Sequence, residues 1–239
     1  MSIHSQYGII ESEKPHKLAV SNLDYVKKLP MASVQTAKSP RTATREKRRQ
    51  QLIDATMKCI GRKGLTGTTL SEVAKEAGLS QGIVNLHFES KDNLLTETLR
   101  SLANEYKTQF DKALQRSGPR PADKLLALME HDLRPSICDR RKLAVWFAFW
   151  GEVKSRPTYR KICDEYDRYY DDVVADLCDQ IIDEGNYEGI TGSAAAEALT
   201  SMTNGLWLSC LLSPQIWDRQ LANDAVNSYL QNVFPKHFS

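Results

Sequence analysis

The stretch that decides the fold runs from Thr68 to Lys91 and reads TTLSEVAKEAGLSQGIVNLHFESK. Thr69 and Glu72 match the S/T-x-x-E capping box, in which two side chains satisfy backbone amides at the start of a helix. Gly78 is the residue type that most easily adopts the left-handed conformation at a helix end. The pattern therefore predicts a short helix that ends at Gly78, with a second helix directly after it.

The second helix of this pair is short and has a polar side. Ser80 is expected to cap it, and Ile83, Val84 and Leu86 are expected to pack inward. The outward positions are then left to Gln81, Gly82, Asn85 and His87.

A third helix is expected to begin at Lys91, with Ser90 as its cap. Two short helices joined in this way form a helix-turn-helix, which places its second helix in a DNA groove. A helical hairpin inside a core gives the same local pattern. The distribution of charged residues along the chain is therefore needed to distinguish a DNA-binding helix-turn-helix from such a hairpin.

Charge is unevenly distributed along the chain. Residues 41–91 hold ten Lys or Arg against five Asp or Glu, whereas the whole chain has a net charge of only +2. Residues 92–239 carry 17 basic against 22 acidic residues. A basic segment followed by an acidic one indicates a phosphate-binding head joined to a body with another task.

The same residues match a known motif. Gly78 to Gly82, Asn85 to Phe88 and Ser90 to Leu95 resemble the G-[VL]-S-x-G-x-x-x-x-x-F-x-[SD]-K-x-x-L-[LF] core of TetR-family transcriptional regulators. As in that family, a helix over 45–61 and the turn Lys63-Gly64-Leu65 precede it. Many members have Tyr where this chain has Asn85. The resemblance covers about 55 residues and implies a DNA-binding helix-turn-helix.

Side-chain chemistry divides the expected DNA contacts into two groups. Gln81 and Asn85 carry amides that can read base edges. Gly82 would permit a close approach to the DNA backbone, or would only relieve crowding between helices. Arg45 and Arg48 could instead form an ordinary solvated surface, and His87 could instead be packed in the core. The side chains with donors suited to phosphate oxygens are Arg45, Arg48, Thr69, Ser80, His87 and Lys91.

Length and composition bound what the rest of the chain can be. A chain of 239 residues with 41% hydrophobic content can bury a core in each of two modest domains. It has no apolar run of about 18 residues, and its start MSIHSQYGII lacks the pattern of a secretion signal. Five cysteines without a C-x-x-C pair favour free thiols in a cytoplasmic protein over disulfides or a zinc site. Motifs such as H-E-x-x-H, G-x-S-x-G or a phosphate loop are missing, so we expect no enzyme, cofactor or metal.

Helical periodicity continues beyond Lys91 without a convincing strand. Residues 1–40 have mixed charge and no sustained period, so we expect a mobile N-terminal arm there. We expect a DNA-binding domain over 41–91 and a ligand-binding and dimerisation domain over 92–239. The predicted fold is all-α with about nine helices, and those beyond residue 90 are expected at 91–116, 121–133, 140–154, 157–185, 193–212 and 218–233.

The last two predicted helices each carry an apolar stripe. Such a pair either closes the core of one molecule or meets a second copy across a two-fold axis. TetR-like proteins use the second arrangement, and a homodimer would set two recognition helices one DNA turn apart on a palindromic operator. The stripes consist of Leu199, Met202, Leu206 and Cys210, and of Leu221, Ala225, Tyr229 and Val233.

A second resemblance lies in the body of the chain. The segments Lys142 to Trp150, KLAVWFAFW, and Asn204 to Leu208, NGLWL, are similar to W-x-A-F-W and D-G-L-W-L of the BetI type, the choline-responsive branch of the TetR family. Asn204 stands where that pattern has Asp. The resemblance implies a repressor of choline and glycine-betaine metabolism genes that a small quaternary-ammonium effector releases or weakens.

Aromatic residues in the body indicate how such an effector would be held. Three rings share one face of the helix at 140–154, and Tyr166, Tyr169 and Tyr170 share a face of the next helix. Their faces would attract a quaternary ammonium group, whereas an ordinary aromatic core is the alternative. The rings expected to line this pocket are Trp146, Phe149, Trp150, Tyr166, Tyr170 and Trp207.

A cationic effector also needs a counter-charge. Glu152, Asp167 and Asp171 lie near enough in sequence to supply it, although solvated helix faces explain them equally well. Two other functions remain open at this stage. One is a TetR-type regulator with a different small apolar or aromatic effector, and the other is a non-specific architectural DNA binder.

Overall fold

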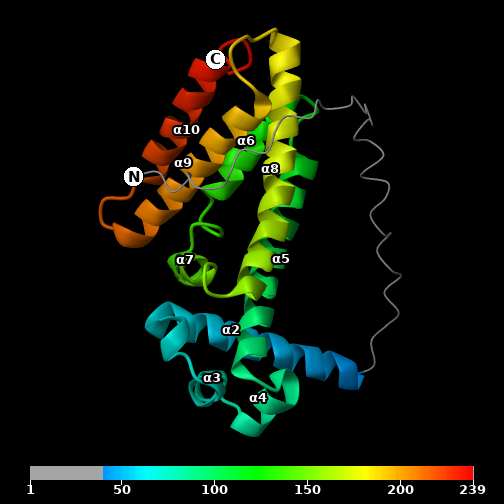
Figure 1. The fold of residues 1–239 in the computed structure, drawn as a ribbon, viewed down its shortest axis with the longest axis vertical. Coiled ribbons are helices and arrows are strands. Elements are labelled where there is room, and N and C mark those ends of the chain that lie inside the picture. Colours follow the sequence, from blue (N-terminus) through cyan, green and yellow to red (C-terminus); the bar gives the residue numbers. More distant parts are fainter. Residues whose placement is uncertain (1–39, 239) are drawn as a thin grey trace. The chain divides into compact units, whose positions relative to one another are not determined.

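The computed structural model describes residues 40–238, with side chains from residue 44 onwards. The arm expected over residues 1–40 lies outside the described residues except for Pro40. Within the described range the fold is all-α, as predicted, with nine helices and no strand (Figure 1). The helices are α2 (Pro40–Gly67), α3 (Leu70–Ala77), α4 (Gln81–Phe88), α5 (Lys91–Arg116), α6 (Pro121–Asp132), α7 (Arg140–Glu152), α8 (Pro157–Gly185), α9 (Gly192–Leu212) and α10 (Arg219–Val233).

Helix ends follow the local sequence signals closely. Helices α5 and α8 begin and end at the predicted residues, and the other body helices differ from their predicted bounds by one or two residues. Helix α2 differs more, because it extends past the predicted end at Gly61 to Gly67. Its break still falls in the predicted turn, since Gly64 has φ 71° and ψ 177°.

A first core holds the three N-terminal helices together. Val73 and Ala77 of α3 and Val84 and Phe88 of α4 pack against α2. Leu94, in the first turn of α5, closes the same core. The side chains that α2 contributes are Leu52, Ile53, Ala55 and Cys59.

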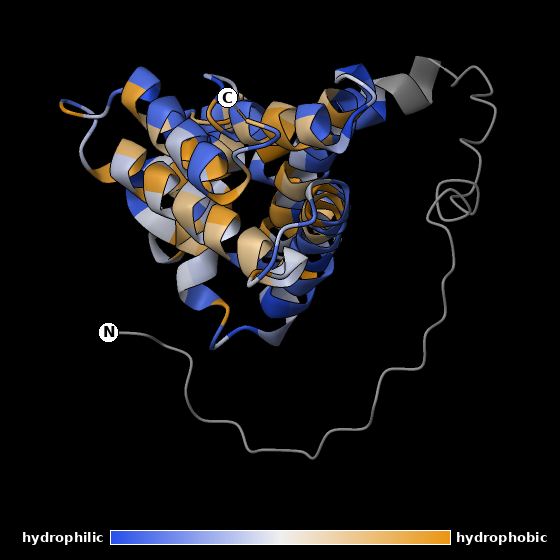
Figure 2. Ribbon diagram, turned by 90° about the horizontal axis from the view of Figure 1, so that it is seen from above, coloured by the Kyte–Doolittle hydropathy of each residue, from blue (hydrophilic) through white to orange (hydrophobic). Residues whose placement is uncertain are grey.

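Two further cores follow along α5. The middle one joins the end of α2 to α5, α7 and α8, with Leu99, Val145 and Phe149 fully buried. The largest one fills the space among α5, α6, α8, α9 and α10, with Leu125 and Ile181 fully buried. In the hydropathy view, the apolar sides of these helices are turned toward one another (Figure 2).

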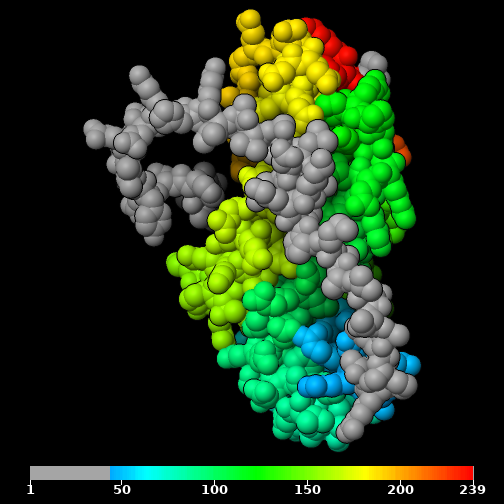
Figure 3. Space-filling view, turned by 90° about the vertical axis from the view of Figure 1, so that its right-hand side faces the viewer, coloured from blue at the N-terminus to red at the C-terminus, as the bar shows by residue number. Residues whose placement is uncertain are grey.

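Helix α5 connects the N-terminal helices to the body. Helices α2, α3 and α4 gather at its N-terminal end, while α8 packs along it and α6 packs beside its C-terminal half (Figure 1). The space-filling view shows the same order, from the cyan N-terminal helices to the green and yellow body helices (Figure 3). Each described helix is too short or too polar to span a bilayer.

Candidate functional site

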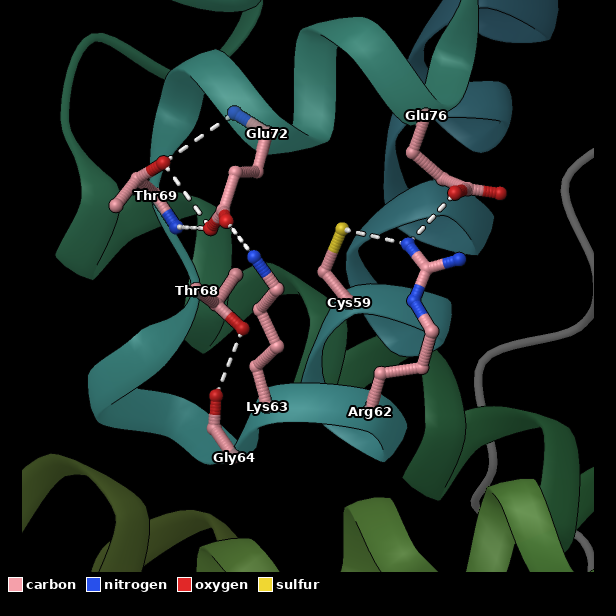
Figure 4. Close-up of polar contacts among 8 residues, drawn as sticks. All are labelled: Cys59, Arg62, Lys63, Gly64, Thr68, Thr69, Glu72 and Glu76. Atoms are coloured by element: carbon pink, nitrogen blue, oxygen red, sulfur yellow. Dashed lines mark hydrogen bonds and ion pairs between the residues drawn. The ribbon is translucent and has the colours of Figure 1, made fainter.

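The start of α3 is fixed by the predicted capping box. The Thr69 hydroxyl accepts a hydrogen bond from the Glu72 amide at 3.2 Å, and the Glu72 carboxylate accepts one from the Thr69 amide at 3.2 Å (Figure 4). Lys63 forms an ion pair with the same carboxylate. Lys63 and the capping box together lower the pKa of Glu72, so the carboxylate stays ionised and the cap stays closed.

Contacts between α2 and α3 orient the pair. Arg62 forms an ion pair with Glu76 at 2.7 Å (Figure 4). The Gln51 amide donates to the Ala77 carbonyl at 2.7 Å, at the end of α3. Gly78 then adopts the left-handed conformation with φ 64°, which confirms the predicted helix end. Helix α4 therefore leaves the turn in a fixed direction.

The polar side of α4 faces solvent. Val84 and Phe88 are buried, whereas Gln81 and Asn85 are exposed on the other side, as expected. Gly82 lies between them and is also exposed. A Cβ built on Gly82 would meet only the Ser80 hydroxyl, at 3.8 Å, so crowding between helices does not explain this glycine.

Two expectations about α4 are wrong. Ser80 occupies the N-cap position, but its side chain makes no capping hydrogen bond. Its hydroxyl is exposed instead. Leu86 does not pack inward: it is 70% exposed. Val84 and Phe88 form the buried side of this eight-residue helix. Helical periodicity therefore places Leu86 on the exposed side, together with Asn85.

Cationic side chains of α2 lie beside α4. His87 is partly buried, and burial lowers its pKa, with Arg45, Arg49 and Arg48 lowering it further. The contact of Arg49 with the Phe88 ring shows that the start of α2 runs next to the end of α4. Arg45 and Arg48 are exposed, whereas Arg49 is tied to Glu97 and lies 5.4 Å from the Phe88 ring centroid.

The remaining two expected contacts lie at the start of α3 and of α5. Thr69 is exposed, with its hydroxyl in the capping box. The Lys91 ammonium group donates to the Thr66 carbonyl at 3.2 Å. Both polar groups already have partners within the protein, whereas none of the described groups bonds to the Gln81 or Asn85 side chain.

A pocket of about 260 Å³ lies in the body, formed by α5, α6, α7, α8 and α9. Four of the six rings expected there line it. We call it the aromatic pocket, and it is lined by Tyr106, Phe110, Met129, Asp132, Trp146, Trp150, Asp167, Tyr170, Asp171, Val174, Thr200, Thr203, Asn204 and Trp207.

Two expected rings lie elsewhere. Phe149 is fully buried in the middle core, with its ring centroid 5.0 Å from that of Tyr159. Tyr166 donates to the Asn104 side chain at 2.7 Å and does not line the pocket. Of the expected counter-charges, Glu152 is also outside, where it accepts a hydrogen bond from Ser155. Sharing a helical face with pocket residues was not sufficient, because Phe149 and Tyr166 pack in or against the middle core instead.

The rings of the pocket meet at edge-to-face geometry around Tyr106. Its centroid lies 4.9 Å from that of Tyr170, with planes at 90°, and 5.7 Å from that of Trp207, with planes at 88°. Trp146 and Trp150 are 6.0 Å apart on α7. The Tyr170 hydroxyl is buried and has no hydrogen-bond partner among the described residues, so it is available to a ligand.

Carboxylates face the same pocket, and the sequence had pointed to two of them, Asp167 and Asp171. Partial burial, then Asp171 and Asp164, raise the pKa of Asp167 to about 6. The third, Asp132, was missed, and it is only 5% exposed. Burial raises its pKa to about 7, although it accepts a hydrogen bond from Tyr106. Ionising such a carboxyl is costly unless a cation lies nearby.

Other features bear on catalysis and metals. The five cysteines are free and buried, and burial raises the pKa of Cys138 to about 12. A thiol with so high a pKa is a poor nucleophile. Among residues 44–238, no three His, Cys, Asp or Glu side chains are placed to hold a metal ion.

Family comparisons agree with both halves of the structure. The sequence model for bacterial regulatory proteins of the tetR family matches residues 52–98, and the one for the C-terminal part of BetI-type transcriptional repressors matches residues 121–235. The HTH-type transcriptional regulator BetI of Paraburkholderia xenovorans is 31% identical over 195 residues, which cover 81% of this chain and 97% of that protein. The protein of the same name from Paraburkholderia phymatum is 32% identical over 191 residues, covering 80% and 95%.

Solved structures share the fold. A transcriptional regulator from Pseudomonas aeruginosa matches with a TM-score of 0.72 and 25% identity, covering 81% of this chain and 95% of that one. A regulator from Saccharomonospora viridis, solved in complex with choline, matches with a TM-score of 0.68 and 20% identity, covering 78% and 96%. The chain thus belongs to the TetR family of transcriptional regulators and is a repressor of the BetI type.

Proposed function

We propose that this repressor reads operator DNA with α4 and releases or weakens its hold when a small quaternary ammonium cation, choline in the first instance, fills the aromatic pocket. The regulated genes would then be those of choline and glycine-betaine metabolism. The observation that carries the DNA assignment is the exposed pair Gln81 and Asn85 on α4, beside Arg45 and Arg48 of α2.

The residues of this surface divide by chemistry. Gln81 and Asn85 would pair with base edges, and Leu86 adds an apolar contact of the kind that a thymine methyl group accepts. Gly82, without a side chain, would let the DNA backbone approach α4. The side chains that would position the protein on phosphates are Arg45, Arg48, Thr69, Ser80, His87 and Lys91.

The effector assignment depends on Asp132. A carboxyl group that is 5% exposed among aromatic rings gains most from a ligand with a positive charge. Ring faces of Trp146, Trp150 and Trp207 would attract the trimethylammonium end. The unpartnered Tyr170 hydroxyl would bond to the hydroxyl end of choline. A volume of about 260 Å³ suits a ligand smaller than a drug, for which pockets of about 300–1,000 Å³ are usual.

A choline complex of the Saccharomonospora viridis regulator, which shares the fold, adds support. A small apolar or aromatic effector is the second candidate, since rings make up much of the lining. It would leave Asp132 without a counter-charge, which is why we favour the cation.

We further propose that the repressor works as a homodimer on a palindromic operator. Leu199 and Cys210, expected at the interface, are buried within the monomer instead. The exposed apolar side chains of this region are Leu208, Leu212, Ile216 and Leu221, at the end of α9, in the following loop and on α10. Leu208 and Leu212 are four residues apart and share one face of α9, and such an exposed apolar face suits a second copy. A two-fold axis there would pair two α4 helices.

Coupling between pocket and DNA would run through α5. Tyr106 and Phe110 of this helix line the pocket, and its first residue follows α4 closely in sequence. A ligand that prefers one orientation of α5 would change the separation of the two α4 helices in the dimer.

Substitutions on α4 and α2 should affect DNA binding differently. Gln81→Ala should reduce the preference for operator over random DNA by roughly 5- to 150-fold, because a bidentate base contact contributes about 1–3 kcal/mol. Arg48→Ala should weaken both alike and lower the slope of affinity against salt by about one. Fluorescence anisotropy with an operator selected from random DNA measures both. Equal losses of specificity in the two variants would contradict the division of roles.

Choline binding should depend on Trp146. Trp146→Ala should lower choline affinity by roughly 2- to 30-fold, since one cation–π contact is worth about 0.5–2 kcal/mol. Tyr166→Phe is the matched control, because it alters an aromatic side chain outside the pocket and should leave the affinity unchanged. Calorimetry on the three proteins gives the answer. Choline that fails to bind, or binds Trp146→Ala as well as the parent, would remove choline as the effector.

Choline affinity should also rise with pH. Asp167 has a pKa raised to about 6 and Asp132 one raised to about 7, so both are largely neutral below these values. Raising the pH through this window ionises them and strengthens attraction to the cation. The same calorimetry from about pH 5 to about pH 8 should show increasing affinity and proton release on binding near pH 7. An affinity independent of pH would mean that neither carboxyl group faces the ligand.

The dimer should depend on the exposed apolar residues. Leu212→Glu should shift the protein toward monomers at micromolar concentration, because the interface would then bury an unpaired charge. Gln180→Glu introduces the same charge at an exposed position of α8, outside these four side chains, and should leave the dimer intact. Sedimentation velocity separates the cases. A monomeric parent protein would rule the dimer out, and a dimer undisturbed by Leu212→Glu would move the interface elsewhere.

A further inference from the structure

A second cavity, of about 170 Å³, opens on the body away from the aromatic pocket. It lies between the C-terminal half of α5, α6 and the segment that follows α6, and the two cavities share no lining residue. In the space-filling view, α5 and α6 make up the green part of the surface (Figure 3). We call this cavity the basic groove, and it is lined by Gln109, Lys112, Ala113, Arg116, Ser117, Ala127, His131, Arg134 and Ser136.

The charge of the basic groove is one-sided. Lys112, Arg116 and Arg134 are exposed cations at its rim, and its lining contains no Asp or Glu. Within the described part of the chain none of the three belongs to an ion pair. Nearby cations on the same helices do have partners, since Lys107 pairs with Asp111 at 2.8 Å. Three like charges held around one hollow repel each other until an anion joins them.

A buried polar group also lines the groove. His131 is only 2% exposed, and its Nε2 atom has no hydrogen-bond partner in the part of the chain that the structure describes. Burial, and then Arg134, lower the pKa of this histidine to about 4, so the ring is neutral near pH 7. A neutral imidazole has one N–H donor and one acceptor nitrogen, and Nε2 would donate to a ligand in the tautomer that carries the proton there. A buried donor without a partner is unfavourable, and a bound acceptor would satisfy it.

We propose that the basic groove is a second ligand site, which binds the phosphate group of a small metabolite through Lys112, Arg116, Arg134 and a hydrogen bond from His131. Three cations match a phosphate dianion better than a single carboxylate. The planar guanidinium groups of the two arginines suit paired hydrogen bonds to phosphate oxygens. The site has its own lining residues and takes a different ligand from the effector proposed for the aromatic pocket.

The two cavities are nevertheless adjacent through α6. His131 lines the basic groove, whereas the next residue, Asp132, lines the aromatic pocket. The His131 ring also packs on Tyr106, with centroids 5.8 Å apart, and Tyr106 donates to Asp132. A phosphate that fixes His131 would therefore also act on the Tyr106–Asp132 pair, so that one ligand changes the affinity for the other.

The test is calorimetry of the full chain with inorganic phosphate, without choline, in a non-phosphate buffer at constant ionic strength. Saturable binding should appear in the parent protein. Arg134→Ala should weaken it by about tenfold or more, because a charge-assisted hydrogen bond is lost. Arg160→Ala removes an exposed arginine of α8 outside the groove and should leave binding unchanged.

Two further measurements separate a built site from general anion attraction. Phosphate should shift the imidazole nitrogen resonances of His131 in a 15N-labelled sample, and the shift should be absent in Arg134→Ala. Citrate should bind more weakly than phosphate. The proposal is overturned by absence of saturable phosphate binding, by equal losses in Arg134→Ala and Arg160→Ala, by unchanged His131 resonances, or by citrate binding as tightly as phosphate.

Discussion

One helix, α5, contributes buried side chains to all three hydrophobic cores, and the rest of the structure depends on this. A helix of 26 residues is about 39 Å long, enough to run from α4 to the middle of the body. Because close-packed cores resist deformation, α5 cannot bend freely in any of them. A change of its direction in the body must therefore appear at α4. Its core residues are Leu94 in the first core, Leu95, Leu99 and Leu102 in the second, and Phe110 and Ala113 in the third.

The end of α6 concentrates buried polar contacts beside this helix. Tyr106 of α5 donates to the Asp132 carboxylate, and Trp207 of α9 donates to the Asp132 carbonyl at 2.8 Å. Arg219, at the start of α10, donates to the Leu133 carbonyl at 2.8 Å. Helices α5, α9 and α10 thus each form a hydrogen bond to Asp132 or Leu133, at the end of α6. A buried carboxyl group with a raised pKa weakens a fold when it ionises, and this is the reason why we propose a cationic ligand beside Asp132.

The sequence was most informative where structure is decided locally. The capping box at Thr69, the turn at Gly78 and the ends of α5 and α8 depend on residues a few positions apart, and all were predicted correctly. Helix caps and periodicity also predicted the all-α fold. Leu86 was misplaced because a helix of eight residues has too few apolar positions to define its inner side.

The pocket was predicted only in part, since it is assembled from five helices. Trp146, Trp150 and Trp207 line it as expected. The sequence does not indicate, however, that Phe149 packs in the middle core and not in the pocket. Asp132 was missed because its partner Tyr106 is 26 residues away on another helix. Contacts of this kind depend on how α5 packs on α6, which helical periodicity does not specify.

We propose that one protein carries a DNA-binding surface and a cation pocket that are coupled through α5. The most direct test of this coupling is to measure choline affinity for the free repressor and for the repressor bound to its operator, alongside operator affinity with and without saturating choline. We predict that operator DNA lowers choline affinity by the same factor by which choline lowers operator affinity. Choline binding that is equal in the free and the DNA-bound repressor would contradict it.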